Sequence, residues 1–191
     1  AEQDIGDDCM CVFIQGGGGD INPLMMARGD NRSGDFEIVQ SMGERLAGEV
    51  QRALSFIDEQ SGVSKSCVSL THFESFRNRW DADKHVELGV TTLLINDDIA
   101  IATLPGEPFH HFQVDFRNKT NLQHSFLFGY CCNGPYAWPS YLPDLLSAAR
   151  GGYGASDTTL AEVGARERLV DKGLVNIRRR GGTRAREFLN S

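Results

Sequence analysis

The pattern of apolar and polar residues along the chain predicts both helices and strands. Apolar residues recur at helical spacing over 35–54, with Asp35 as the N-cap, which predicts a helix that packs on the core. Alternating apolar and polar residues over 63–76 predict a strand half exposed to water. Short apolar runs at 11–15 and 125–131 predict two further strands.

Two β-branched runs, 86–95 and 99–104, flank a polar turn at 96–98, which is typical of a β-hairpin. A Pro-Gly pair ends the second run. Glu107 follows this pair directly, at the carboxyl end of a strand and before a helix that Pro108 would begin. A carboxylate at this place either caps the free amides of the helix or acts as a functional acid, base or metal ligand. From the residues alone, the cap is the favoured interpretation.

The second half of the chain predicts two more helices. Asp144 is a suitable N-cap for a short helix at 145–150, which a Gly-Gly pair would end. A last helix is predicted to begin at 158 or 159 and to end at 178, and a basic tail is predicted over 178–191. Together these elements predict an α/β fold over 1–191, a mixed sheet with packed helices in one domain.

Composition and charge limit the partners that the chain can have. It has 191 residues, of which 40% are hydrophobic and 24% charged, as in ordinary globular domains. A net charge of -7 and a pI near 5.2 argue against nucleic acid and anionic membranes as partners. No apolar run approaches the ~20 residues that span a bilayer, and no signal peptide opens the chain, so we expect a soluble protein of undetermined compartment. The chain starts at Ala1 without a methionine, so we expect this end to be cut or processed.

The five cysteines do not have the spacing of a disulfide framework. One close pair reads Cys-Met-Cys and the other is vicinal. Because no Cys-x-x-Cys spacing is present, free buried thiols are favoured over a thiolate metal site. These residues are Cys9, Cys11, Cys67, Cys131 and Cys132.

Four consecutive glycines at 16–19 allow close approaches of the backbone that side chains would forbid. A phosphate-binding loop would account for them, but the spacing argues against it. Ile21 stands where a dinucleotide fingerprint needs its third glycine, and no Gly-Lys-Ser/Thr follows.

Four longer motifs are specific enough to suggest a family. They are FIQGGGGDINP at 13–23, DFEIVQSMGERLAGEV at 35–50, LPGEPF at 104–109 and YLPDLLSAARGGY at 141–153. With these motifs the chain resembles the neutral/alkaline non-lysosomal ceramidase family, in its N-terminal catalytic domain, over nearly its full length. The resemblance implies that the chain is the C-terminal part of such a domain.

The resemblance also implies a zinc site. In this family the glutamate of the Pro-Gly-Glu motif and the first tyrosine of the later block are ligands of a catalytic zinc, and a second tyrosine lines the same pocket. These residues map to Glu107, Tyr141 and Tyr153. The family's histidine ligands lie upstream of the glycine-rich motif. We therefore expect this chain alone to hold an incomplete site and to be inactive, with the upstream part of the domain as its partner.

The chain departs from the family at Asn22, where the family has a serine nucleophile. An amide cannot act as that nucleophile. Asp20 and Asn22 remain candidate catalytic residues, together with Tyr153. Asn22 either donates a hydrogen bond to a carbonyl or oxyanion, or stabilises a turn before Pro23, and the turn is slightly favoured.

Two other segments leave alternatives open. His110 and His111 follow Glu107 by three and four residues, so on a helix they would share its face and could join it around a metal, although simple neighbours are favoured. The loop 133–140 is rich in aromatic residues and proline. It forms either a lid over the core or the wall of an apolar acyl-binding or ring-binding pocket.

Two functions from different classes follow. The first is a zinc-dependent hydrolase that cleaves an amide or related bond of a small-molecule or lipid-like substrate with metal-activated water. The second is a non-catalytic binding or structural module that keeps the fold. The hydrolase hypothesis predicts that Glu107, Tyr141 and Tyr153 converge on one cleft beside Asn22, because two parallel strands would open at the same end of the sheet.

Overall fold

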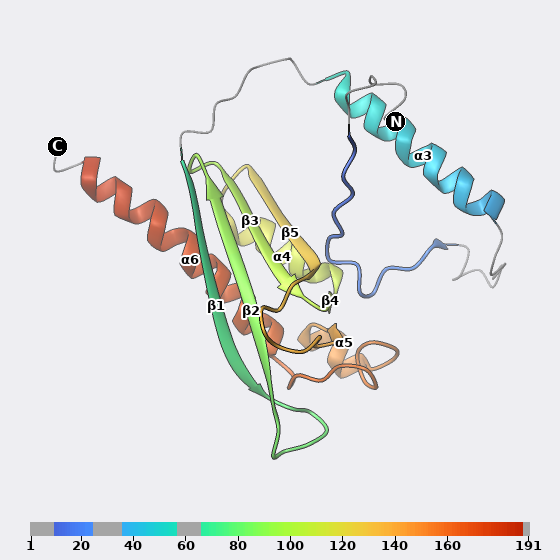
Figure 1. Cartoon of the computed structure of the whole chain (residues 1–191), viewed down its shortest axis with the longest axis vertical. Helices are drawn as coiled ribbons and strands as arrows, with labels where there is room; N and C mark the ends of the chain where they lie inside the picture. The colour runs from blue at the N-terminus through green and yellow to red at the C-terminus, as the bar shows by residue number, and fades with distance from the viewer. Residues whose placement is uncertain (1–9, 25–35, 57–65, 189–191) are drawn as a thin grey trace. The chain divides into compact units, whose positions relative to one another are not determined.

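The computed structural model describes residues 10–24, 36–56 and 66–188. The chain divides into two compact units, residues 1–14 with 22–63 and residues 15–21 with 64–191, and each is described by itself. The first unit contains the helix α3 (Phe36–Leu54). The second contains a sheet with its covering helices (Figure 1).

The second unit is built on a four-stranded sheet in the order β1-β2-β3-β5. The strand β2 is antiparallel to both β1 and β3, whereas β3 and β5 are parallel. The prediction of a mixed α/β fold is therefore confirmed. The strands are β1 (Cys67–Arg77), β2 (His85–Ile95), β3 (Ile99–Pro105) and β5 (His124–Cys131).

The predicted hairpin between β2 and β3 is present. Asn96 and Asp97 have φ of 54° and 59°, the left-handed conformation that tight two-residue hairpin turns need. The amide of Asp98 donates to the carbonyl of Ile95 at 3.0 Å, and Ile95 pairs with Ile99. The short polar side chains of this turn tolerate the left-handed conformation better than apolar ones would.

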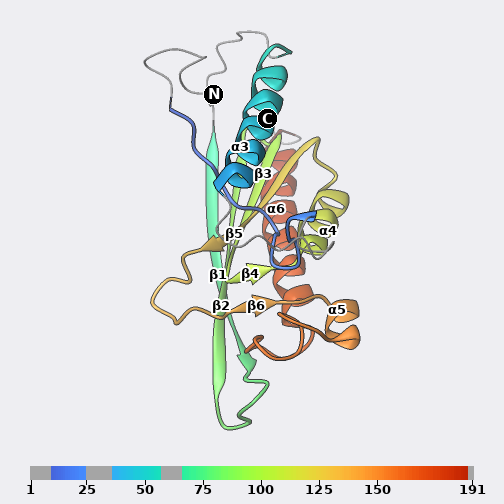
Figure 2. The same ribbon diagram turned by 90° about the vertical axis from the view of Figure 1, so that its right-hand side faces the viewer.

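Two helices cover one face of the sheet. The helix α4 (His110–Thr120) connects the parallel strands β3 and β5, and α6 (Ala165–Phe188) lies beside it on the same face (Figure 2). The core lies between these helices and the sheet. Its most deeply buried side chains include Phe76, Leu88, Val90, Leu104, Phe112, Phe116, Leu127 and Leu169.

A second, two-stranded sheet lies past the end of the main one. It pairs β4 (Glu107–Pro108) in parallel with β6 (Tyr141–Leu142). The short helix α5 (Leu145–Arg150) follows, and its N-cap is Asp144 as predicted, since the amide of Ser147 donates to the Asp144 carboxylate at 3.0 Å.

The last helix differs from its predicted bounds. It begins at Ala165 rather than at 158 or 159, because Thr159 and Ala161 pair as isolated bridges with Ser140 and Asn78 and Gly164 has a φ of 92°. It also continues to Phe188, through most of the segment that the sequence assigns to a basic tail.

One expectation for the first part of the chain is wrong. Residues 10–16 form no regular strand, although the carbonyl of Gln15 accepts a hydrogen bond from the amide of Gly129 at 3.0 Å. The helix α3 forms as predicted, and within its own unit none of its residues is buried. Its packing on a core stays a prediction. Its predicted N-cap, Asp35, lies outside the described residues.

Candidate functional site

The pairing of β4 with β6 places Glu107 directly opposite Tyr141. The amide of Glu107 donates to the carbonyl of Ser140 at 3.0 Å, and the amide of Phe109 donates to the carbonyl of Leu142 at 3.1 Å. Gly106 permits this approach, because its φ is 71° and a β-carbon there would collide with the Ser140 carbonyl. Backbone hydrogen bonds thus fix two residues from distant motifs side by side.

Phenol hydroxyls surround the Glu107 carboxylate. The Tyr130 hydroxyl donates to Glu107 Oε2 at 2.9 Å, and Tyr141 lies directly opposite Glu107 in the β4–β6 pair. Partial burial, then the hydrogen bond and charge of Glu107, raise the pKa of Tyr130 to about 12. The hydrogen bond with Tyr153, then burial and the carboxylate of Glu107, raise the pKa of Tyr141 well above its usual value. Both phenols are therefore protonated at neutral pH, and the Tyr130 hydroxyl acts as a donor to the carboxylate.

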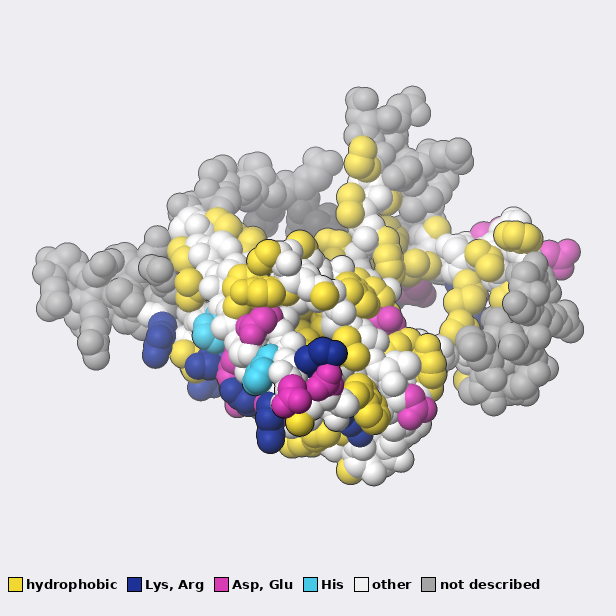
Figure 3. All heavy atoms as spheres, turned by 60° about the horizontal axis from the view of Figure 1, so that its bottom comes forward, with side chains coloured by type: hydrophobic (Ala, Val, Ile, Leu, Met, Phe, Trp, Pro, Cys, Tyr) yellow, Lys and Arg dark blue, Asp and Glu magenta, His cyan; other side chains and the backbone are white. Residues whose placement is uncertain are grey.

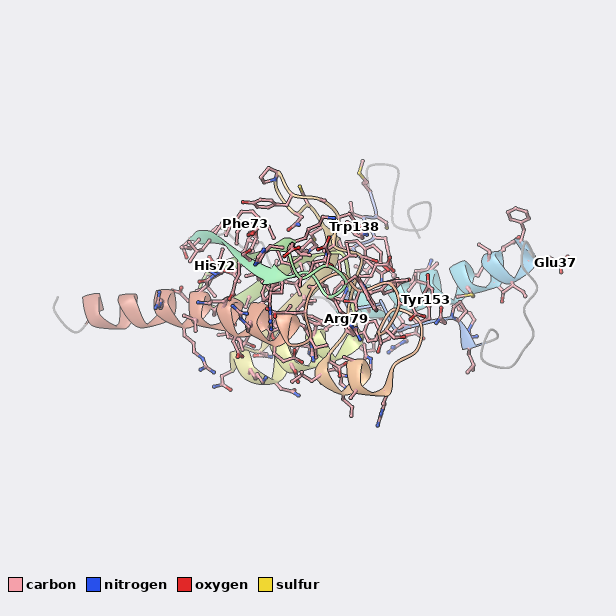
Figure 4. The ribbon with its side chains drawn as sticks, turned by 90° about the horizontal axis from the view of Figure 1, so that it is seen from below. Glu37, His72, Phe73, Arg79, Trp138 and Tyr153 are labelled. Atoms are coloured by element: carbon pink, nitrogen blue, oxygen red, sulfur yellow. The ribbon has the colours of Figure 1, made fainter. Side chains whose placement is uncertain are left out.

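Tyr153 completes this group, which we call the tyrosine cluster: Glu107, Tyr130, Tyr141 and Tyr153. The rings of Tyr141 and Tyr153 meet edge to face with centroids 5.3 Å apart. Gly154, with a φ of 79°, allows the chain to pass close to the Tyr141 ring. Tyr153 itself is 77% exposed, so it forms the solvent side of the cluster (Figure 4).

The structure thus brings together three of the residues that the sequence predicts for one site, Glu107, Tyr141 and Tyr153. The strands β3 and β5, which lead toward them, are parallel as that argument requires. Asn22 belongs to the first unit and is therefore described apart from the cluster. The metal-binding and catalytic roles of these residues stay predictions.

Asp20 lies in the glycine loop of the second unit and caps α4. The amide of His110 donates to Asp20 Oδ1 at 2.6 Å, and the second carboxylate oxygen contacts His110 Nδ1 at 2.5 Å. The amide of Gly19 donates to the Pro108 carbonyl at 2.9 Å, which holds the loop in place. The expectation that Glu107 caps this helix is wrong, because β4 pairs with β6 and so directs Glu107 to the phenols.

The two histidines pair with aspartates and not with Glu107. His111 Nδ1 lies 3.2 Å from Asp144 Oδ2, and the ring centroids of His110 and His111 are 4.0 Å apart. The helix begins at His110, so Glu107 is not on it, and the predicted shared helical face does not exist. Burial alone would raise the pKa of Asp144, but the hydrogen bonds from Ser147, with Arg166 and His111, lower it to about 2.

The described part of the chain contains no group of three or more histidine, cysteine, aspartate or glutamate side chains placed to hold a metal ion. Cys67, Cys131 and Cys132 are not in disulfides, and Cys9 lies outside the described residues. The donor set of the tyrosine cluster is one carboxylate with neighbouring phenols, and oxygen ligands of this kind fit part of a zinc site.

Sequence reasoning missed Tyr130. It has the unusual φ of 57° at the end of β5, where it turns its hydroxyl to Glu107. It lies one residue before Cys131, which pairs with Pro105, so the register of β3 and β5 and not a local sequence signal brings it near Glu107. In parallel strands, residues at matching positions near the carboxyl ends meet at the same edge.

Among the described residues, no helix has both the length and the apolar composition to cross a membrane. Comparison with family models, curated proteins and solved structures found no match for this chain. The geometry of the cluster is therefore the evidence on which a functional proposal has to rest.

Proposed function

We propose that this chain supplies the Glu107 and Tyr141 ligands of a zinc-dependent hydrolase that cleaves an amide or related bond, as its resemblance to the neutral ceramidases implies. The observation that carries the proposal is the β4–β6 pair, which sets the two side chains opposite each other. Two motifs that are separate in sequence thus meet at one place, as the proposal requires.

Each residue of the cluster has a distinct part in this proposal. Glu107 and Tyr141 would hold the metal, which when bound would activate a water molecule and polarise the substrate carbonyl. Tyr130 keeps the Glu107 carboxylate oriented through its 2.9 Å hydrogen bond. Tyr153, exposed at the rim, faces an incoming small-molecule or lipid-like substrate. Further zinc ligands have to come from outside the cluster, because zinc sites use three or four protein ligands.

Ceramide itself is a poor candidate for the substrate. Asn22 carries no hydroxyl and cannot replace the family's serine nucleophile. Hydrolysis would therefore depend on direct attack by metal-activated water.

A second candidate function is a non-catalytic binding or structural module. One observation favours it: the Glu107 carboxylate already accepts a hydrogen bond from Tyr130, so it has a partner without a metal. In such a module the cluster would serve to join β4, β5 and β6.

A zinc titration of the intact chain by calorimetry tests the hydrolase proposal. We expect weak binding that dialysis removes, since two ligands make an incomplete site. Glu107→Gln and Tyr141→Phe should each weaken it about tenfold or more. Asp98→Asn, in the β2–β3 turn, removes one carboxylate elsewhere and should have no effect. Equal zinc affinity in the wild type and Glu107→Gln would refute the ligand assignment, and tight stoichiometric zinc would point to other ligands.

A further inference from the structure

A cavity lies beside the aromatic loop 133–140, apart from the tyrosine cluster. Its volume is about 260 Å³, and it opens between this loop and the ends of β1 and β2 that meet at their connection. Figure 3 shows this end of the molecule, with hydrophobic side chains gathered among charged ones. Its lining includes the aromatic rings of Tyr136 and Trp138, the apolar side chains of Val86 and Leu160, and the polar side chains of Asn78, His85 and Glu87.

The aromatic wall of the cavity is held in place by Asn133, which is only 5% exposed. Asn133 Oδ1 accepts from the amide of Gly89 at 3.0 Å. Its side-chain amide donates to the carbonyls of Glu87 at 2.8 Å and Ala137 at 3.0 Å. The loop is therefore fixed to β2 before any ligand arrives, which lowers the entropy cost of binding.

Neighbouring rings position the two aromatic side chains of the wall. The rings of Tyr136 and Phe73 meet edge to face with centroids 5.2 Å apart, and the ring centroids of Trp138 and Tyr130 are 6.0 Å apart. Phe73 and Trp138 both lie on the side of the sheet away from α6 (Figure 4). Tyr136 and Trp138 remain 42% and 48% exposed, so part of each ring is open to a ligand.

Glu87 is the charged group of the cavity that has no partner. It is half-buried, and within the described part of the chain its carboxylate takes part in no hydrogen bond or ion pair. The arginine and lysine side chains nearest to Glu87 in sequence form ion pairs with other residues. Arg77 pairs with Glu162 at 2.9 Å, and Lys84 pairs with Asp81 at 2.8 Å.

Arg79 is also committed, since it donates to the Ala155 carbonyl at 2.7 Å and lies over the Trp80 ring. Among the described residues no cation pairs with Glu87, although His85, two residues before it on β2, lines the same cavity. A positively charged ligand would give this carboxylate an opposite charge at short range.

We propose that this cavity binds a small organic cation, an ammonium or quaternary ammonium group on a short apolar body. Trp138 and Tyr136 offer ring faces for cation–π contact, Glu87 supplies the opposite charge, and Val86 and Leu160 contact the apolar body. An anion would be repelled by Glu87 in a chain of net charge -7, and a neutral ligand would cover Glu87 without pairing it. The site does not depend on the proposed hydrolase activity.

Calorimetric titration of the intact chain with choline tests the proposal. The matched probe is its neutral isostere, in which a tert-butyl group replaces the trimethylammonium group. Both molecules have nearly the same shape, so a difference in affinity reports the charge. We expect choline to bind about tenfold more tightly than the isostere. Equal affinities, or no binding of choline, would overturn the proposal.

Two variants locate the site. Glu87→Gln keeps the side-chain shape and the backbone carbonyl that Asn133 uses, and should weaken choline binding about tenfold without affecting the isostere. Trp138→Leu should weaken it by a similar factor. Asp98→Asn makes the same change in net charge at the opposite end of β2 and should bind choline as the wild type does. Wild-type affinity in Glu87→Gln, or an equal loss in Asp98→Asn, would show that the cavity is not the site.

Discussion

The helices α3 and α6 have similar amphipathic patterns but differ in how deeply each is buried within its own unit. Leu169, Val170, Leu174 and Ile177 of α6 are at most 6% exposed, whereas Val39 and Leu46 of α3 are 65% and 55% exposed. A period of 3.6 residues in the sequence therefore predicts that a helix forms. It does not identify what the apolar side contacts, because that depends on residues elsewhere in the chain.

Specific features of α6 explain its close fit to the sheet. A β-carbon at Gly173 would lie 3.4 Å from Thr92 Cγ2, an ordinary van der Waals distance, so the helix lies close against β2 at this position. Arg166 is buried with its charge paired to Asp115 at 3.0 Å, and its guanidinium lies over the Phe112 ring. In α3 the comparable pair, Arg52 with Glu49, is exposed to water.

The largest expected effect is on the free energy of unfolding, and it compares a buried leucine of α6 with an exposed leucine of α3. Leu169→Ala removes a fully buried side chain and should lower the free energy of unfolding by about 3 kcal/mol. Leu46→Ala should change it by less than about 0.5 kcal/mol, because Leu46 is exposed. Urea denaturation of both variants measures the two values. A loss in Leu46→Ala as large as in Leu169→Ala would mean that α3 is packed after all.

The next effect concerns pH and Asp144, whose carboxylate bonds Ser147 and His111 and lies in the field of Arg166 from α6. The folded pKa of Asp144 is about 2, below the unfolded value of about 3.9, so its stabilisation is complete above about pH 4 and is lost as the pH falls toward 2. Asp144→Asn should therefore cost about 2 kcal/mol at neutral pH, and this difference from the wild type should shrink in acid. Glu49→Gln in α3 is the matched exposed change. A pH-independent difference for Asp144→Asn would contradict the linkage.

The smallest effect compares the charges of the two helices. Arg166→Met leaves Asp115 and Glu167 without their buried partner, and should cost about 1.5 kcal/mol. Arg52→Met breaks an exposed pair and should cost less than about 0.5 kcal/mol. Thermal unfolding of the two variants at the same ionic strength measures both. Equal costs would show that burial of Arg166 adds nothing to its interactions.

Local signals in the sequence were enough for several elements. The polar turn at 96–98 correctly predicted the β2–β3 hairpin, and Asp144 correctly predicted the start of α5. Both features depend on interactions between residues that are close in sequence. The side-by-side placement of Glu107 and Tyr141 was also predicted, but from a family resemblance joined to a strand argument.

The failures involve partners that are distant in sequence. Glu107 suited a cap by its position, yet Asp20 takes that place from the glycine loop. Thr159 suited a helix start, yet its bridge to Ser140 holds it extended. Tyr130 carries no local mark of its role, because its hydrogen bond to Glu107 depends on the register of two parallel strands. Such contacts are set by tertiary structure and have no period in the sequence.

The β4–β6 pair also constrains the order in which the chain can fold. Its two short strands flank α4 and β5 in sequence, so their pairing closes a loop that contains that whole crossover unit. Closing so long a loop costs entropy, and strands of this length cannot persist alone. We therefore expect the pairing of Glu107 with Tyr141 to form late in folding, so that a ligand needing both residues depends on an assembled crossover unit.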